Sequence, residues 1–130
     1  MTTSLRSPAR EASEKAYSPY SSAKVGCALE TASGKIYTGC NVENASYGGT
    51  VCAERVAIFK AVSEGELKIT RLYVYTKAGW PPCGFCRQVL SEFADAETEI
   101  IIGDDKGMER TILMKDLLPL SFGPKDLANK

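Results

Sequence analysis

Three cysteines and one glutamate are spaced so that together they could bind a metal ion and use it. Cys52 opens a Cys-Ala-Glu stretch that ends at Glu54, and Cys83 and Cys86 form a Cys-x-x-Cys motif directly after Pro82. Residues three apart share one face of a helix, so both thiols of the motif can point the same way. Zinc takes four ligands, and three protein ligands leave one position for water, as in catalytic zinc sites.

Glu54 could act on a water molecule at that open position without binding the ion itself. A first-turn acid is also common simply because the helix dipole favours it, and an isolated Cys-x-x-Cys can be a redox pair or half of a structural zinc site. A redox pair would leave Cys52 and its neighbouring acid unexplained. The full combination, Cys-x-Glu and then Pro-Cys-x-x-Cys after a predicted strand, matches the three-cysteine form of the zinc-deaminase signature.

The remaining cysteines, Cys27 and Cys40, lie in strand-like segments, where we expect small buried core residues. Histidine is absent, so a zinc site must use thiolates, carboxylates or water. Five cysteines are an odd number, which argues against a framework of disulfides.

Hydrophobic periodicity predicts the elements that position these residues, in the order helix, two strands, helix, strand, helix, two strands, short helix. The predicted helices are Ala9–Tyr17, Val51–Ser63, Cys83–Ala94 and Lys115–Leu118. The predicted strands are Val25–Leu29, Lys35–Gly39, Arg71–Thr76, Glu99–Ile102 and Arg110–Leu113. We therefore expect one α/β domain over residues 1–130, a three-layer α/β/α sandwich around a central mixed five-stranded sheet.

The charge balance restricts the kind of ligand. Sixteen basic residues face sixteen acidic ones, whereas proteins that follow polynucleotide backbones usually carry a basic excess. A small and nearly neutral ligand fits better than DNA or RNA. The apolar runs are too short to span a bilayer, and Met1–Ser13 lacks the apolar segment of a secretory signal. We expect a cytoplasmic protein that does not engage membranes.

Further segments extend the likeness beyond the metal motif. The chain resembles the small homotetrameric cytidine deaminases over nearly its whole length. The matching segments are Tyr17–Ser21, Val25–Gly26, Gly39–Ala45, Cys52–Arg55, Lys60–Gly65, Pro82–Gln88 and Leu117–Phe122. The metal motif belongs to the whole deaminase superfamily, and Asn41–Ala45 with the Leu-Leu-Pro segment points to the branch that acts on free nucleosides.

The resemblance implies hydrolytic deamination of cytidine and deoxycytidine in pyrimidine salvage, with one Zn²⁺ per subunit held by the three cysteines of the motif. Activated water would attack C4 of the pyrimidine, and Glu54 would carry its proton to N3 and then to the departing amine. It further implies that Arg55 and Arg87 hydrogen-bond the thiolates and draw off negative charge.

The resemblance also assigns the substrate contacts. Asn41 and Glu43, two residues apart in an extended segment, would bind the ribose, although Asn41 could instead stabilise a turn. Tyr47 would line the sugar site, and Ala53 would offer backbone groups to the pyrimidine. Phe122 would reach the pocket of a neighbouring subunit in a homotetramer, although simple core burial would also explain an aromatic there.

One position departs from the family pattern. Ala23 stands where members usually carry an aromatic near the base, and Trp80 could fill the space. The wider pocket suggests an alternative substrate, a modified pyrimidine nucleoside or a nucleoside antibiotic. Two further alternatives are a zinc-stabilised binding domain without activity and a deaminase of polynucleotides.

Overall fold

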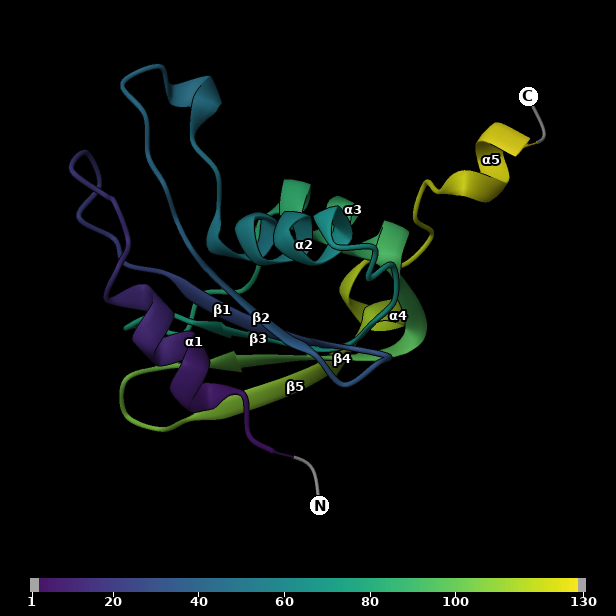
Figure 1. Cartoon of the computed structure of the whole chain (residues 1–130), viewed down its shortest axis with the longest axis horizontal. Helices are drawn as coiled ribbons and strands as arrows, with labels where there is room; N and C mark the ends of the chain where they lie inside the picture. Colours follow the sequence, from purple (N-terminus) through teal and green to yellow (C-terminus); the bar gives the residue numbers. More distant parts are fainter. Residues whose placement is uncertain (1–2, 129–130) are drawn as a thin grey trace.

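The computed structural model describes residues 3–128 and centres on one five-stranded sheet in the order β2-β1-β3-β4-β5 (Figure 1). Its strands are β1 (Gly26–Thr31), β2 (Ile36–Cys40), β3 (Ile69–Tyr75), β4 (Ala94–Gly103) and β5 (Glu109–Leu113). β3 and β4 run parallel, and the other neighbouring pairs are antiparallel. The predicted mixed five-stranded sheet is confirmed.

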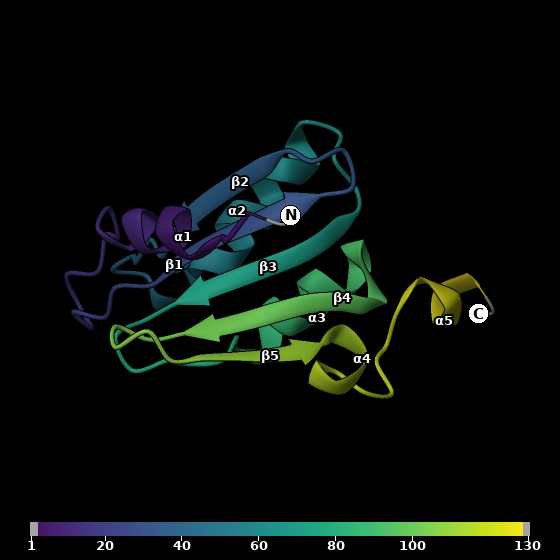
Figure 2. The ribbon, with the colours of Figure 1, turned by 90° about the horizontal axis from the view of Figure 1, so that it is seen from below.

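Helices cover both faces of the sheet. Helix α1 (Arg6–Ser13) lies on one face, and α2 (Ala53–Ser63), α3 (Gly84–Phe93) and α4 (Met114–Leu117) lie on the other (Figures 1 and 2). The 3₁₀ turn η1 (Tyr47–Gly49) and helix α5 (Pro124–Ala128) stand away from the body. The longest helix has 11 residues, and none in the described part is long and apolar enough to cross a bilayer.

Alternation along β3 divides the core between the two faces. Leu72 and Val74 join the larger apolar cluster beneath α2, α3 and α4, whereas Tyr73 and Tyr75 join the smaller cluster beneath α1. Successive side chains of a strand point to opposite faces, so a central strand covered on both sides is apolar throughout. This burial supports a rigid sheet beneath the helix that carries Cys52.

Two glycines allow helices to approach the sheet backbone. A Cβ atom at Gly26 would clash with the carbonyl oxygen of Ala9 in α1. At Gly39 it would lie 2.6 Å from both the carbonyl oxygen of Ala53 and the amide nitrogen of Ala57 in α2. Close contact at Gly39 therefore fixes the first turn of α2 over β2.

The order of elements agrees with the prediction, but some boundaries were wrong. The first helix is Arg6–Ser13, not Ala9–Tyr17, because proline is tolerated in a first helical turn and Pro8 lies there. Tyr17 instead forms a β-bridge with Val42. β4 begins at Ala94, directly after α3, and the five-residue α5, which buries no residue, was not predicted.

Candidate metal centre and active site

Helices α2 and α3 begin close together, and each begins at a cysteine. Cys52 is the N-cap of α2 and Cys83 the N-cap of α3, both with extended backbone. Their carbonyls accept the first helical hydrogen bonds, from Val56 and Arg87, while neither thiol caps its helix. Both sulfurs are therefore free of a capping role, next to the partial positive charge of two helix N-termini.

The three sulfurs of the predicted motif converge. The sulfur of Cys83 lies 3.7 Å from that of Cys52 and 3.6 Å from that of Cys86, and all three lie within 4.8 Å of one another. Zinc–sulfur bonds of about 2.3 Å at tetrahedral angles place two sulfurs about 3.8 Å apart. The donor set and its spacing therefore fit one zinc ion. The described residues offer no other such cluster of His, Cys, Asp and Glu.

The thiols also influence one another's ionisation. Hydrogen bonding from Cys86, together with the guanidinium of Arg55, lowers the pKa of Cys52 below its ordinary value. Contact with the Cys52 sulfur and burial raise the pKa of Cys86. The cluster thus stabilises a thiolate on Cys52, and binding of a cation displaces the remaining protons.

Glu54 is buried beside this cluster, with only 4% of its surface exposed. Its Oε1 atom has no hydrogen-bond partner, and burial raises the pKa of the carboxyl group to about 7. An unpartnered polar atom in a protein interior is costly and rare outside functional sites. A carboxyl group of this kind can accept and return a proton near neutral pH.

A cavity of about 330 Å³ opens onto these residues. Cys52, Cys83 and Glu54 line it, together with Asn41 and Glu43. A volume of this size suits one small molecule. Five of the residues predicted from sequence are therefore brought together around one space.

The predicted sugar-binding pair holds the neighbouring loop in place. Asn41 accepts a hydrogen bond from the Val25 amide and donates one to the Ala23 carbonyl. Glu43 accepts hydrogen bonds from the amides of Tyr20 and Ser21 and from the Ser21 hydroxyl, and this bonding lowers its pKa. Asn41 thus does stabilise a turn, and each side chain keeps part of its hydrogen-bonding capacity.

The two arginines differ from each other. The Nη2 atom of Arg55 lies 3.5 Å from the Cys52 sulfur, as predicted. Arg87 instead donates to the carbonyls of Pro82 and Leu117, at 2.9 and 3.1 Å. The expectation that Arg87 bonds a thiolate is not met, because its side chain ties α3 to the end of α4.

The other predicted contacts lie around the cavity or outside it. Ala53 is fully buried at the start of α2. Tyr47 is exposed on η1 and faces Tyr20, with ring centroids 6.1 Å apart. Phe122 is exposed too, which excludes simple core burial within this chain, and its carbonyl accepts a hydrogen bond from Gln88.

Sequence reasoning missed one wall residue with a clear role. Thr76, at the end of β3, is buried and lines the cavity, and its hydroxyl accepts a hydrogen bond from the Trp80 amide. This bond anchors the loop that leads to Cys83. The position of Thr76 directly after a strand was the available signal, since ligands gather at the carboxyl ends of parallel strands.

Cys27 is buried, as predicted, whereas Cys40 is only partly covered.

Three convergent cysteine sulfurs at two helix N-termini, beside an unpartnered buried carboxyl group, are the arrangement found in zinc-dependent hydrolases. The family model for the cytidine and deoxycytidylate deaminase zinc-binding region matches residues 2–102. The chain belongs to this family.

Relatives and solved structures agree with that assignment. A protein of Halalkalibacterium halodurans named cytidine deaminase is 46% identical over 119 residues, which cover 90% of each chain. The cytidine deaminase of Mycobacterium tuberculosis is 41% identical over 95% of this chain and 90% of its own. The crystal structure of cytidine deaminase from Burkholderia pseudomallei superimposes with a TM-score of 0.89 at 43% identity, covering 94% of this chain and all of that one.

Proposed function

We propose that this enzyme hydrolyses the exocyclic amine of cytidine and deoxycytidine, giving uridine or deoxyuridine and ammonia. The observation that carries the proposal is the set of three convergent sulfurs beside the unpartnered Oε1 atom of Glu54, next to a cavity sized for one small molecule. The names of the relatives support the choice of substrate.

Cys52, Cys83 and Cys86 would hold the zinc ion, which supplies Lewis-acid activation of a water molecule. Glu54 would take one proton from that water as its oxygen bonds to C4 of the pyrimidine, and would give this proton to N3. It would then take the remaining proton of the new C4 hydroxyl and pass it to the exocyclic amine, so that the C4–N bond breaks, the C4 carbonyl forms and ammonia leaves. Its burial keeps the carboxyl group close to the reacting atoms and away from competing solvent. Positioned proton transfer of this kind typically accelerates a reaction by ~10²–10⁴-fold.

The rest of the cavity would orient the nucleoside. Asn41 retains one amide hydrogen and one oxygen lone pair, and Glu43 Oε2 accepts a single hydrogen bond from protein, so both can still bind sugar hydroxyls. We assign the pyrimidine edge to the backbone of Ala53, at the start of α2. Arg87 keeps a supporting role, because it fixes the loop around Pro82 that precedes Cys83.

We further propose that four copies assemble. Tyr47 and Phe122 are large aromatic side chains that this chain leaves exposed, on η1 and two residues before α5. Exposed aromatics of this kind are typical of protein contacts. In a homotetramer Phe122 would enter a neighbouring subunit's pocket, and Tyr47 would line the sugar site.

The proposal extends to the setting of the reaction. One sheet with a core on each face supports a single catalytic domain over residues 1–130. A centre made of three thiolates needs a reducing compartment, which favours the cytoplasm. Conversion of free cytidine to uridine there would serve pyrimidine salvage.

Ammonia release and the loss of cytidine absorbance, measured on zinc-loaded protein, test the proposal. Wild type should turn over cytidine and deoxycytidine, whereas E54Q should keep its zinc and lose ~10²–10⁴-fold in kcat. E92Q, which changes an exposed glutamate of α3, is the matched control. Absence of turnover with both nucleosides would overturn the proposal. Unchanged properties of E54Q would favour a binding domain without activity, and tight binding of single-stranded DNA at physiological salt would favour a polynucleotide deaminase.

A further inference from the structure

The candidate active-site cavity has one aromatic residue in its wall. Within residues 3–128, Trp80 is the only aromatic residue that lines it, and it is also the only tryptophan of the chain. It stands three positions before Cys83, which lines the same cavity. The substrate of the proposed reaction carries a flat aromatic ring, and an aromatic face binds such a ring better than an aliphatic wall does. Trp80 is therefore placed where it could hold the base.

The loop that carries Trp80 is held on both sides of this residue. The Trp80 amide donates a hydrogen bond of 2.7 Å to the hydroxyl of Thr76, which is buried directly after β3. On the other side, Arg87 donates to the carbonyl of Pro82, the residue directly before Cys83. The backbone beneath the indole is thus restrained between β3 and α3. Such restraint lowers the entropy cost of ordering the ring against a ligand.

The indole itself is not part of the protein core. Trp80 is half exposed, and in the described part of the chain neither an aromatic ring nor a cation stacks on it. Tryptophan is highly buried on average, and large exposed apolar side chains often mark places where another molecule binds. Because Trp80 lines the cavity, part of this free surface lies where a bound ligand can reach it.

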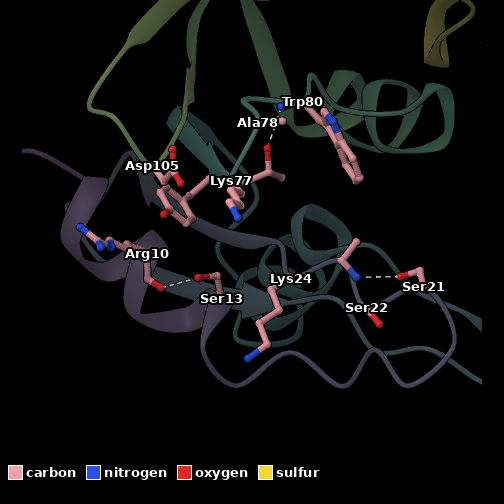
Figure 3. A pocket seen from close by; sticks show the side chains of 12 residues that line it. Arg10, Ser13, Ser21, Ser22, Lys24, Lys77, Ala78, Trp80 and Asp105 are labelled. Atoms are coloured by element: carbon pink, nitrogen blue, oxygen red, sulfur yellow. Dashed lines mark hydrogen bonds between the residues drawn. The ribbon is translucent and has the colours of Figure 1, made fainter.

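The segment across from Trp80 offers only a small side chain to the cavity at Ala23. In Figure 3, the indole of Trp80 points from its loop toward the segment that carries Ser21, Ser22 and Lys24. Ala23 lies in that segment and lines the same cavity as Trp80. Both residues also line a second space of about 610 Å³, so Trp80 borders the room beside Ala23 and does not fill it. A ring bound there meets an indole from one segment and a methyl group from the other.

The reacting atoms determine where the ring must lie. In the proposed reaction, C4 and N3 of the pyrimidine lie next to the three sulfurs and Glu54. Because Glu54 and Cys83 line the same cavity as Trp80, a base in that position stays within the space that the indole borders. A wall that contacts the face of the ring leaves its edge, with N3 and the exocyclic amine, free to react. Binding of the base and its chemistry then depend on different residues.

We propose that Trp80 binds the face of the pyrimidine and that its indole selects a flat ring over a puckered one. This inference rests on the proposed function, because the deaminated base is the ring that Trp80 binds. An aromatic face contacts the substrate and the transition state alike, so the indole contributes to affinity and not to the chemical step. Trp80 is accordingly a binding and specificity residue, and Glu54 keeps the catalytic role.

Kinetics on zinc-loaded protein test this role with two variants and a matched control. W80L keeps an apolar side chain without an aromatic face, and W80F restores such a face. F59L is the control, because Phe59 of α2 is 49% exposed, against 53% for Trp80, and lies outside the cavity lining. W80L should raise KM for cytidine roughly five- to tenfold, with kcat within about twofold of wild type and an unchanged zinc content. W80F and F59L should stay within about twofold of wild type in both constants.

Two binding measurements need no turnover. Because Trp80 is the only tryptophan, tryptophan fluorescence reports on this indole alone, and uridine should quench it in a saturable manner. Calorimetry should show that wild type binds uridine more tightly than dihydrouridine, whose saturated ring is puckered and not aromatic. W80L should lose most of this preference, and W80F should retain it. A loop that is merely disturbed would weaken both ligands equally and would keep the preference.

The outcomes separate this role from the proposed function. Wild-type KM in W80L, or an undiminished preference of W80L for uridine over dihydrouridine, would overturn the role of Trp80. Turnover of cytidine by wild type in that case would leave the proposed function standing. Dissociation of W80L into smaller assemblies with wild-type affinity for uridine would also overturn the role, since the indole would then be a subunit contact. Saturable quenching and a preference that depends on Trp80, without turnover of cytidine or deoxycytidine, would reject the function and keep Trp80 as a binding residue.

Discussion

The Nη2 atom of Arg55 lies 3.5 Å from the sulfur of Cys52, three positions before it in the chain. Three thiolates on one Zn²⁺ leave a charge of −1, and a neighbouring guanidinium offsets it. The ring of Phe85 lies 5.5 Å from the guanidinium carbon of Arg55 and covers it from the α3 side. The arginine is therefore held between a sulfur and an aromatic ring, where it can moderate the charge on the ion.

Replacement of Arg55 should weaken catalysis without abolishing it. We expect R55Q to retain zinc and to lose about 10–100-fold in kcat, because loss of a group that supports a metal ligand has effects of this size. The measurement is kcat for cytidine alongside the zinc content of the same sample. R110Q, on the exposed strand β5, serves as control. An R55Q enzyme with wild-type kcat would show that the contact has no role in the reaction.

Loss of one cysteine of the cluster should abolish specific zinc binding. C83S removes a sulfur that lies within 3.7 Å of both others, so its zinc affinity should fall by more than the roughly 100-fold expected for a merely supporting residue. Zinc competition against a chromogenic chelator measures the affinity. C40S changes a cysteine outside the cluster and should bind zinc normally. Equal zinc loss in both variants would contradict the assignment.

The contact between Gly39 and α2 should matter for stability and for the centre together. In G39A the added Cβ meets backbone atoms of Ala53 and Ala57 at 2.6 Å, so α2 must shift. We expect a loss of about 1–3 kcal/mol in the free energy of unfolding, measured by urea denaturation, with weaker zinc binding. G48A adds a Cβ with open space around it and should change stability little. Similar losses for the two variants would disprove the effect of close packing.

Truncation of Phe122 should reveal whether subunits complete one another. If this exposed ring packs into a neighbouring chain, F122A will weaken association of the tetramer by more than ~1 kcal/mol. Turnover should fall in parallel with this dissociation. Sedimentation velocity across a concentration series measures the first effect. M108A removes another exposed apolar side chain, between β4 and β5, and is the control. A monomeric wild type with full activity would reject this role.

Much of the fold could be predicted because the apolar pattern is consistent along the chain. β1 and β3 are central and apolar, and α3 has a clear apolar face, so their types were recognisable. The start of β4 was not recognisable, because the residues near its beginning, Asp95, Ala96 and Glu97, are exposed and either polar or small. The early start of α1 was missed because Pro8 lies in its first turn, where proline is tolerated although it usually marks the limit of a helix.

The metal cluster was predictable because its residues lie at fixed local spacings at two helix starts. The partners of Arg87 were not, because Leu117 approaches it from an element 30 residues away. A cavity of about 610 Å³ that shares Ala23 and Trp80 with the candidate active site was also beyond sequence reasoning. Ala23 indicated extra space, but the cations around that space come from α1, from the loop before β1 and from the loop after β3.

X-ray absorption spectroscopy at the zinc edge tests the central claim most directly, because it counts the sulfurs bound to the ion. Zinc-loaded wild type should show three sulfurs at about 2.3 Å and one oxygen or nitrogen near 2.0 Å. E54Q should give the same spectrum, and C83S should not. A shell of four sulfurs, or one with no sulfur, would contradict an open zinc site beside Glu54.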